Sequence, residues 1–340
     1  MGMRPRLHVT NGDVAASTLE QLLPHDDVLP WRDPMVDGPF PAGLDLAATS
    51  QLRAAHLAGP NLDYDQVLRD FRLRDEHLAS ASRYREITLW FEHDLLDQLQ
   101  ILQILDRLAS AEFADTRLSM ICINSFPGVD PFRGLGQLDP TQMATLRDKA
   151  SAVTAQQLIL ARAGWAAFRS PDPRDIETFL TQDLQALPYL RAALARHLQE
   201  FPSTSNGLGR TDRQLMRLVS EGVVRPGRLF ADNTALETTL FLGDWGVYRH
   251  IEDLCNARQP LLSAKPYGAF RGPLDPALST EDFRKQELSL TESGRRVLAN
   301  EADASDFRDI DCWLGGVHLT NGKPIWRWNE SAGRLQVAQR

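Results

Sequence analysis

Four short apolar runs, each followed at once by a polar cluster, lie within the first 125 residues and constrain the fold most. The apolar runs are residues 7–9, 28–30, 87–91 and 118–123, and the polar clusters are residues 10–13, 31–33, 92–94 and 124–125. In an open α/β sheet, parallel strands end at a shared edge, and ligands usually bind in the crevice there. If the runs are parallel strands, four separate segments are predicted to contribute to one site.

Helical patterns lie between these runs. The clearest one follows the third run, and its leucines alternate with polar residues: Leu95, Leu99, Leu102, Leu105 and Leu108 against Gln98, Gln100, Gln103 and Asp106. The third run is continuously apolar, as a strand buried on both faces requires. Strands that alternate with helices indicate a parallel sheet with right-handed crossovers. We therefore predict a three-layer α/β ligand-binding domain over residues 1–138. Its loop at 33–39 contains two prolines and a glycine, which excludes regular structure and suits a lid over the strand ends.

The remainder of the chain is predicted to form a helical segment, residues 139–202, and a winged-helix-like domain, residues 203–340. This last region shows three helical patterns, two short strands at 261–262 and 287–290, and a closing helix. A capping box of Thr211 and Gln214 opens its first helix. At the end of the chain, the Asn-Gly pair at 321–322 predicts a hairpin with strands 318–319 and 325–328.

Composition limits the class of protein. A length of 340 residues favours two domains, and a formal net charge of −8 disfavours tight binding to a nucleic-acid backbone. No apolar run is long enough to span a bilayer, and the N-terminus lacks the apolar region of a signal peptide, so we expect a cytoplasmic protein. Cys122, Cys255 and Cys312 are far apart and odd in number, which indicates neither a disulfide framework nor a zinc site. We interpret Cys122 and Cys255 as small core residues.

Three adjacent ionisable residues, Glu92, His93 and Asp94, follow the third run and are the candidate catalytic residues. Such groups at the end of a buried strand are costly unless they are solvated, paired or used. Carboxylates and a neutral imidazole can bind a divalent metal or act as general acids and bases. Adjacent side chains point in different directions, so we expect at most two of the three to face the crevice. In the structural alternative, Asp94 caps the following helix and Asp97 lies in its first turn, both favourable with the helix dipole.

The turn of Thr10, Asn11, Gly12 and Asp13 is a candidate ligand-binding segment. A turn before a helix can present backbone N–H groups to an anion. It lacks the spacing of the familiar nucleotide-binding fingerprints. The alternative is a tight turn in which Asp13 caps the helix.

Further candidate ligand contacts follow the second and fourth runs. Trp31, Arg32 and Asp33 form either a surface ion pair beside a core tryptophan or a site whose guanidinium binds phosphate or carboxylate. Asn124 follows the fourth run and completes the set. We interpret His8 as a hydrogen-bonded core residue, whereas a structural role and a ligand contact stay equally open for His318.

Three N-terminal motifs and two C-terminal motifs, which together span nearly the whole chain, resemble motifs of a known family. They are HVTNGD at 8–13, VLPWRD at 28–33 with DGP at 37–39, WFEHDLLDQL at 90–99, PSTSNGL at 202–208 and WLGGVHL at 313–319. Together they resemble a bacterial family catalogued as domain of unknown function number eighteen thirty-five. The resemblance implies that the N-terminal clusters belong to one architecture, and it implies no particular reaction.

Two hypotheses of function share the predicted crevice. In the first, the N-terminal domain is an enzyme or binding domain for a small anionic molecule, such as a nucleotide or a phosphorylated metabolite. Its residues have separate roles: Asn11, Gly12 and Asp13 hold the anion or a metal, Arg32 neutralises charge, and Glu92 or His93 is the acid–base group. In the second, the protein is regulatory, with a sensing N-terminal domain and a winged helix that contacts DNA or a protein partner. The third helix of residues 203–340 carries mixed charge, which favours a protein contact over base reading. The sequence identifies no metal, cofactor or oligomeric state.

Overall fold

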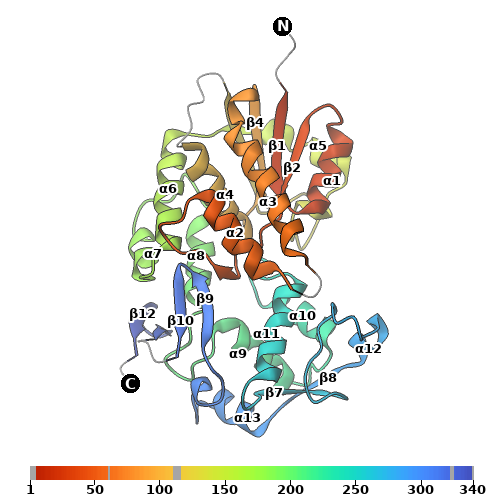
Figure 1. The fold of residues 1–340 in the computed structure, drawn as a ribbon, viewed down its shortest axis with the longest axis vertical. Helices are drawn as coiled ribbons and strands as arrows, with labels where there is room; N and C mark the ends of the chain where they lie inside the picture. Colours follow the sequence, from red (N-terminus) through yellow and green to blue (C-terminus); the bar gives the residue numbers. More distant parts are fainter. Residues whose placement is uncertain (1–4, 60–61, 110–115, 322–324, 339–340) are drawn as a thin grey trace. The chain divides into compact units, whose positions relative to one another are not determined.

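The computed structural model describes residues 5–59, 62–109, 116–321 and 325–338, and the chain divides into two compact units, Met1–Leu194 and Ala195–Arg340 (Figure 1). A five-stranded sheet of order β2-β1-β4-β5-β6 forms the centre of the first unit. Its strands are β1 (Arg6–Asn11), β2 (Asp27–Trp31), β4 (Glu86–Glu92), β5 (Arg117–Ile123) and β6 (Ser151–Ala152). The first four are parallel, which confirms the predicted α/β class, and β6 runs antiparallel to β5. The β6 strand lies in a segment that the sequence predicts to be helical, so that detail is wrong.

Helices connect the strands of the first unit. They are α1 (Asp13–Leu22), α2 (Leu46–Leu57), α3 (Tyr64–Ala79), α4 (Leu95–Ala109), α5 (Pro140–Ala144), α6 (Ala155–Arg169), α7 (Arg174–Phe179) and the 3-10 turns η1 (Ala81–Arg83), η2 (Leu135–Gln137) and η3 (Arg147–Lys149). A further helix, α8 (Leu190–Leu198), begins in the first unit and ends in the second. The loop predicted to lack regular structure contains the two-residue strand β3 (Gly38–Pro39). No helix in the described part of the chain is long and apolar enough to cross a membrane.

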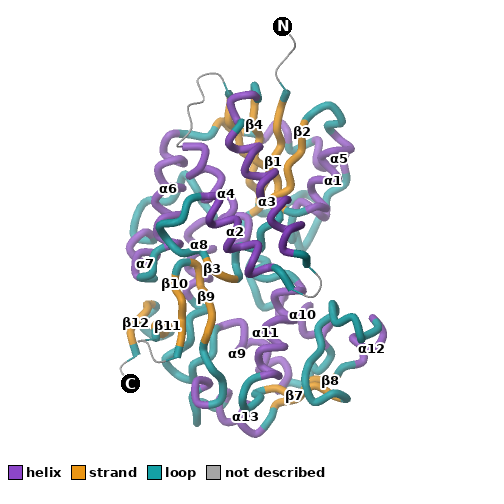
Figure 2. Tube along the Cα trace, viewed as in Figure 1, coloured by secondary structure: helices purple, strands orange, loops and turns teal. Residues whose placement is uncertain are grey.

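Helices cover both faces of the parallel sheet. Trp90, Ile121 and Ile123 pack with residues of α1 and α5 in one buried cluster. Because side chains alternate along a strand, Leu89 and Phe91 face the opposite side of the sheet, and α4 packs against β4. In Figure 2, α1 and α5 lie to one side of the strands, and α4 and α6 lie to the other. The carboxyl ends of four strands are thus held between two helical layers.

The glutamines that alternate with the leucines of α4 are buried. Gln98, Gln100 and Gln103 are 2%, 1% and 3% exposed. Gln103 accepts a hydrogen bond from the indole nitrogen of Trp31 at 3.1 Å, and Gln100 donates to the carbonyl of Trp31 at 3.0 Å. Gln98 donates to the carbonyl of Glu92 at 2.7 Å. These side chains therefore fix the ends of β2 and β4 against one helix.

A buried ion pair holds the loop at residues 33–39. The side chains of Arg53 and Asp33 are 0% and 1% exposed, and Asp33 Oδ1 accepts bonds from Arg53 Nε at 3.0 Å and Nη2 at 2.7 Å. Arg53 also donates to the carbonyls of Pro34 and Asp37. The loop is thus anchored to α2, which disfavours its movement as a lid.

We predict that Arg53→Met lowers the free energy of unfolding by about 3–5 kcal/mol, because it leaves Asp33 as a buried charge without its main partner. Urea unfolding at neutral pH measures the loss. Arg72→Met is the matched control, since Arg72 is exposed on α3. Equal losses in the two variants would contradict the importance of the buried pair.

After the end of α8, the second unit continues with three helices, α9 (Arg210–Ser220), α10 (Pro226–Ala235) and α11 (Asp244–Asn256). The strands β7 (Leu262–Lys265) and β8 (Glu287–Leu290) then pair antiparallel, with the helix α12 (Thr280–Lys285) between them. The helix α13 (Glu292–Leu298) and the turn η4 (Ala304–Asp306) follow. Three helices, two strands and a closing helix follow in the expected order, but α12 lies between the strands, where the sequence predicts an irregular segment. The classification as a winged helix stays a prediction.

The predicted capping box of the first helix in this unit is wrong. Gly209 is the residue before α9, and no side chain caps it. Thr211 lies inside the helix, and its hydroxyl and backbone N–H both donate to the carboxylate of Glu200. A buried carboxylate from the preceding segment therefore replaces the local cap.

The predicted hairpin around residues 321–322 is also wrong. The strand β10 (Val317–Thr320) pairs with β9 (Asp311–Gly315), and β11 (Trp326–Asn329) pairs with β12 (Arg334–Val337). Gly315 has a φ of 61°, a conformation that suits the tight turn between β9 and β10. Residues 322–324, where the predicted turn falls in part, lie outside the described residues.

Charged residues buried in the second unit are paired. Asp212 lies 2.7 Å from Nδ1 of His250 and 2.7 Å from Nη2 of Arg308. Burial alone lowers the pKa of His250, but the hydrogen bond and charge of Asp212, with Glu200 and Asp253 nearby, outweigh it and raise the pKa to about 9. The protonated imidazole is therefore part of the folded structure at neutral pH.

We predict that the stability advantage of the wild type over His250→Gln depends on pH. The folded-state pKa of about 9 exceeds the ordinary 6.5, so the advantage is full below pH 6.5 and is lost as pH rises through 9. Its size should be on the order of 2 kcal/mol. Urea midpoints between about pH 6 and about pH 10 test it. In an Asp212→Asn background, the same substitution should show little pH dependence, and an undiminished dependence there would refute the pairing.

Candidate functional site

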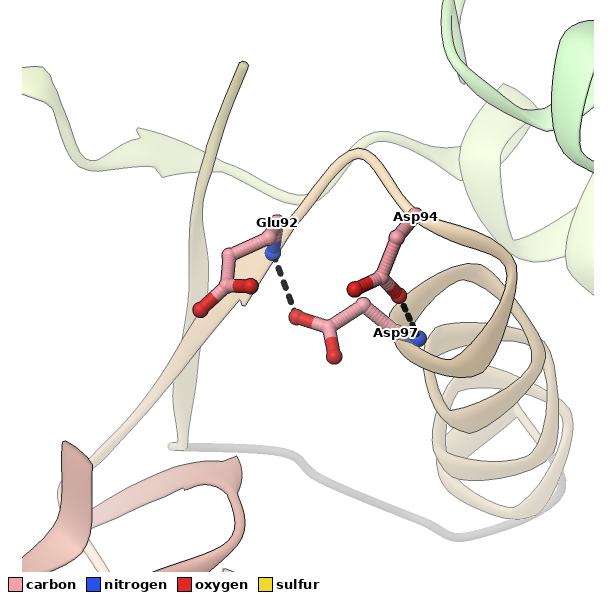
Figure 3. Close-up of side chains that lie close together, drawn as sticks. All are labelled: Glu92, Asp94 and Asp97. Atoms are coloured by element: carbon pink, nitrogen blue, oxygen red, sulfur yellow. Dashed lines mark hydrogen bonds between the residues drawn. The ribbon is translucent and has the colours of Figure 1, made fainter. Parts of the chain in front are cut away.

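Three carboxylates, from Glu92, Asp94 and Asp97, form a buried cluster where β4 ends and α4 begins (Figure 3). Their residues are 3%, 5% and 0% exposed. One oxygen from each lies within 4.8 Å of one from each of the others, a spacing that a single metal ion can bridge. The cluster lies at the carboxyl edge of the parallel sheet, where ligands bind in folds of this kind.

Asp97 is fixed by contacts from two strands and from its own helix. Its Oδ2 accepts a hydrogen bond from the backbone N–H of Glu92 at 2.6 Å, and its Oδ1 accepts one from the side-chain amide of Asn11. The N–H of Asp97 donates to Asp94 Oδ1 at 2.9 Å. Asp94 therefore caps α4, as the structural alternative predicts, and it also belongs to the cluster.

Glu92 is positioned by the turn at η2. The backbone N–H of Leu135 donates to Glu92 Oε1. Gly134, the preceding residue, has a φ of 151°, and a Cβ at this position would lie 2.4 Å from Glu92 Oε2. The turn therefore requires glycine in order to receive the carboxylate.

Within the described residues, no Arg, Lys or His forms an ion pair with Glu92, Asp94 or Asp97. Burial, together with the charge of Asp94, raises the pKa of Glu92 to about 8, and burial raises that of Asp94 to about 6. Burial and both neighbouring carboxylates raise the pKa of Asp97 well above its usual range. Burial therefore disfavours full ionisation of the cluster at neutral pH, and a nearby cation would favour it.

His93 and Cys122 lie next to the cluster without belonging to it. Burial lowers the pKa of His93, although a hydrogen bond with the backbone of Ile123 opposes this shift. Burial and the charge of Asp97 raise the pKa of the Cys122 thiol far above its usual range, so it is no nucleophile at neutral pH. All three cysteines are free: Cys255 is buried as predicted, Cys122 is only partly buried, and Cys312 is exposed.

Of the predicted ligand-binding residues at positions 10–13, Asn11 contacts the cluster directly. Asn11 contacts Asp97, as described above. Thr10 is fully buried, and its hydroxyl has no hydrogen-bond partner within the described part of the chain. Gly12 precedes α1 with a φ of 55°. Asp13 does not cap α1, so that prediction is wrong: no side chain caps this helix.

Other predicted residues are engaged elsewhere. Arg32 forms an ion pair with Asp13 at 2.7 Å, and the side chains are 48% and 69% exposed, so the pair contributes little stability. Trp31 is buried and bonded to Gln103 on α4, and Asp33 is bonded to Arg53. Asn124 follows β5 and is exposed. His8 is buried as expected, and its Nδ1 accepts a hydrogen bond from the indole of Trp90 at 3.0 Å.

Asp97 belongs to the cluster but is not among the site residues predicted from the sequence. The signal is its spacing from Asp94, because residues three apart at the start of a helix lie on the same side. Helix capping alone also explains this spacing, and the structure shows the cap: the N–H of Asp97 donates to Asp94. The glycine turn that receives Glu92 comes from more than forty residues further along the chain and has no local signal.

Comparison with models of known protein families found no match, and comparison with curated proteins found none either. The family resemblance of the motifs therefore stays a prediction.

We predict that Gly134→Ala is more destabilising than Gly128→Ala. Both glycines have positive φ, 151° and 80°, so both variants carry backbone strain, typically about 1–3 kcal/mol. Only Gly134 lies against Glu92, whereas a Cβ at Gly128 meets nothing within 4 Å. Thermal unfolding of both variants isolates the cost of displacing Glu92, and equal melting temperatures would show that the carboxylate tolerates displacement.

Proposed function

We propose that the first unit is a metal-dependent enzyme domain that binds Mg²⁺ or Mn²⁺ through Glu92, Asp94 and Asp97 and acts on a small phosphorylated molecule. The observation that carries the proposal is the cluster itself: three buried carboxylates whose oxygens lie within 4.8 Å, with no cationic partner in the described residues. Buried charges in proteins are normally paired or bound to metal. An all-oxygen donor set favours hard cations such as Mg²⁺ and Mn²⁺ over Zn²⁺ or copper.

The hydroxyl of Thr10 supports a ligand at this edge independently of the acidic residues. Thr10 pairs with Trp90 across β1 and β4, and Glu92 follows Trp90 by two residues. Because strand side chains alternate, Thr10 and Glu92 occupy the same face of the sheet on adjacent strands. The hydroxyl is fully buried and unpartnered within the described residues, which is costly unless a ligand or a metal-bound water completes it.

The charge of the first unit explains why an anionic ligand needs the metal. Residues 1–194 contain 26 Asp and Glu against 18 Lys and Arg, so the whole net charge of −8 lies in this unit. An anion that approaches three carboxylates is repelled, whereas a bound divalent cation reverses the local field. Mg²⁺ is commonly held by one or two carboxylates together with substrate phosphates. When bound, such an ion polarises a phosphoryl oxygen and lowers the pKa of coordinated water.

The regulatory alternative receives less support from the second unit. Residues 195–340 contain 19 acidic and 19 basic residues, which gives no basic footprint for DNA. The third helix, α11, exposes Glu252 and Asp253. Contact of this unit with DNA or with a protein partner stays a hypothesis, and the proposal is based on the first unit.

Metal binding is tested by thermal unfolding of the full-length protein after treatment with EDTA. We predict that MnCl₂ or MgCl₂ raises the melting temperature of the wild type, with a gain of about 2.7 kcal/mol at about a hundred times the dissociation constant. Glu92→Gln and Asp97→Asn should lose this response. Inorganic phosphate should add a further shift in the presence of metal and none in EDTA.

Glu86→Gln is the matched control for this experiment. Glu86 begins the same strand that Glu92 ends, and it forms an ion pair with Arg6 at 3.2 Å. This variant should keep the full metal response. A wild type that responds to neither metal, or a control that loses the response together with Glu92→Gln, would overturn the proposed site.

A further inference from the structure

A cavity of the first unit lies between α2, α3 and the last turn of α4, away from the carboxylate cluster. Its volume is about 260 Å³, and its lining is mostly apolar. Sites for drug-sized ligands usually measure about 300–1,000 Å³, so this one suits a smaller molecule. Arg107 lines the cavity and lies ten residues after Asp97 on α4, a rise of about 15 Å. The cavity and the cluster are therefore separate.

Matching faces of two packed helices bound this cavity. The helices α2 and α3 pack against each other (Figure 1). Residues of α3 that line the cavity recur every three or four positions: Leu68, Arg72, Asp75 and Ala79. Residues at this spacing lie on one side of a helix. From α2, Leu46 and Ser50 line the cavity with the same spacing. The side chains of both helices thus turn towards one space.

The buried polar groups of the lining are already bonded. Ser50 Oγ donates to Asp75 Oδ2 at 2.6 Å and accepts a hydrogen bond from Arg74 Nη2 at 2.8 Å. Arg74 Nε also donates to Asp75 Oδ1 at 2.9 Å. The charge of Asp75 is therefore compensated by Arg74, so Asp75 offers little attraction to a cationic ligand.

Two arginines of the lining have no such partner. The side chains of Arg72 and Arg107 form no hydrogen bond or ion pair with the residues that the structure describes. Glu76, which also lines the cavity, forms no ion pair with the described residues either. These three groups supply two positive charges and one negative charge, a balance that a monoanion neutralises. A guanidinium matches a carboxylate, which can accept two parallel hydrogen bonds from it.

We propose that this cavity binds a small monocarboxylate that carries an apolar chain. Arg72 and Arg107 hold the carboxylate of the ligand. Its chain packs against Leu46 and Leu68, which supply the apolar lining. A mainly apolar cavity with a few polar groups that fix the orientation of the ligand is the usual form of a small-molecule site. This site does not depend on the proposed metal-dependent function, because it lies at the other end of α4.

Hexanoate, hexanamide and acetate test the two parts of the ligand separately. Each is titrated calorimetrically into the full-length protein in EDTA, at low ionic strength because salt screens exposed charges. The wild type should bind hexanoate about 3- to 10-fold more tightly than hexanamide, which lacks the charge. It should bind hexanoate at least about tenfold more tightly than acetate, which lacks the apolar chain.

Substitutions in the lining locate the binding. Arg72→Gln and Arg107→Gln should each lower the affinity for hexanoate about 3-fold or more and leave that for hexanamide unchanged. Arg69→Gln is the matched control, because Arg69 is exposed on the same helix but bonds to Gln66 and does not line the cavity. Ala79→Phe replaces an exposed residue of the lining and fills the cavity. It should abolish the binding of hexanoate although both arginines remain.

The cavity site and the metal site can fail separately. Glu92→Gln should bind hexanoate as the wild type does. No binding of hexanoate by the wild type, equal binding of hexanoate and acetate, or an unchanged affinity in both arginine variants would overturn the cavity site and leave the metal site intact. Loss of hexanoate binding in Glu92→Gln would also overturn it. Absence of a metal response with hexanoate binding preserved would overturn the proposed function alone.

Discussion

The carboxylate of Asp97 connects the helix α4 to the ends of the strands β1 and β4. It is fully buried at the start of α4, and it receives the amide of Asn11 from β1 and the backbone N–H of Glu92 from β4. A single acidic side chain thus fixes the ends of two adjacent parallel strands against the N-terminus of a helix. The helix dipole favours a carboxylate at this position. The same geometry places Glu92 and Asp94 beside Asp97. The residues that connect α4 to the strands therefore also form the candidate metal site.

The buried glutamines of α4 fix the rotation of this helix about its axis. Leucines alone would bury the helix without fixing its rotation, because apolar contacts are not directional. Gln98, Gln100 and Gln103 bond instead to defined groups at the ends of β4 and β2. Buried polar side chains are tolerable only when they are bonded, so few other rotations of the helix satisfy them. The first turn of α4 is therefore held towards the strand ends, where its carboxylates meet.

The sequence could predict those parts of the first unit that depend on local patterns. Apolar runs followed by polar clusters located β1, β2, β4 and β5 and selected Glu92, His93 and Asp94 as candidate catalytic residues. Of these three, the structure brings Glu92 and Asp94 together with Asp97. Features that depend on distant partners could not be predicted. Two glutamines of α4 bond to Trp31, a residue far away in the sequence, and Gly134 approaches Glu92 from another part of the chain. At Thr211 a distant carboxylate, Glu200, replaces the predicted local cap.

Other buried carboxylates in this chain are paired with cations, and the carboxylates of the cluster differ from them. Asp33 is bonded to Arg53, and Asp212 lies between His250 and Arg308. In each case the cost of removing a carboxylate from water is offset by a cation and by hydrogen bonds. Glu92, Asp94 and Asp97 are equally buried and are hydrogen-bonded, but the described residues supply them with no cation. Stability alone would favour amides at these positions, since an amide oxygen can accept the same backbone bonds without a charge. A divalent cation bound by all three carboxylates is therefore the best explanation for their presence where β4 ends and α4 begins.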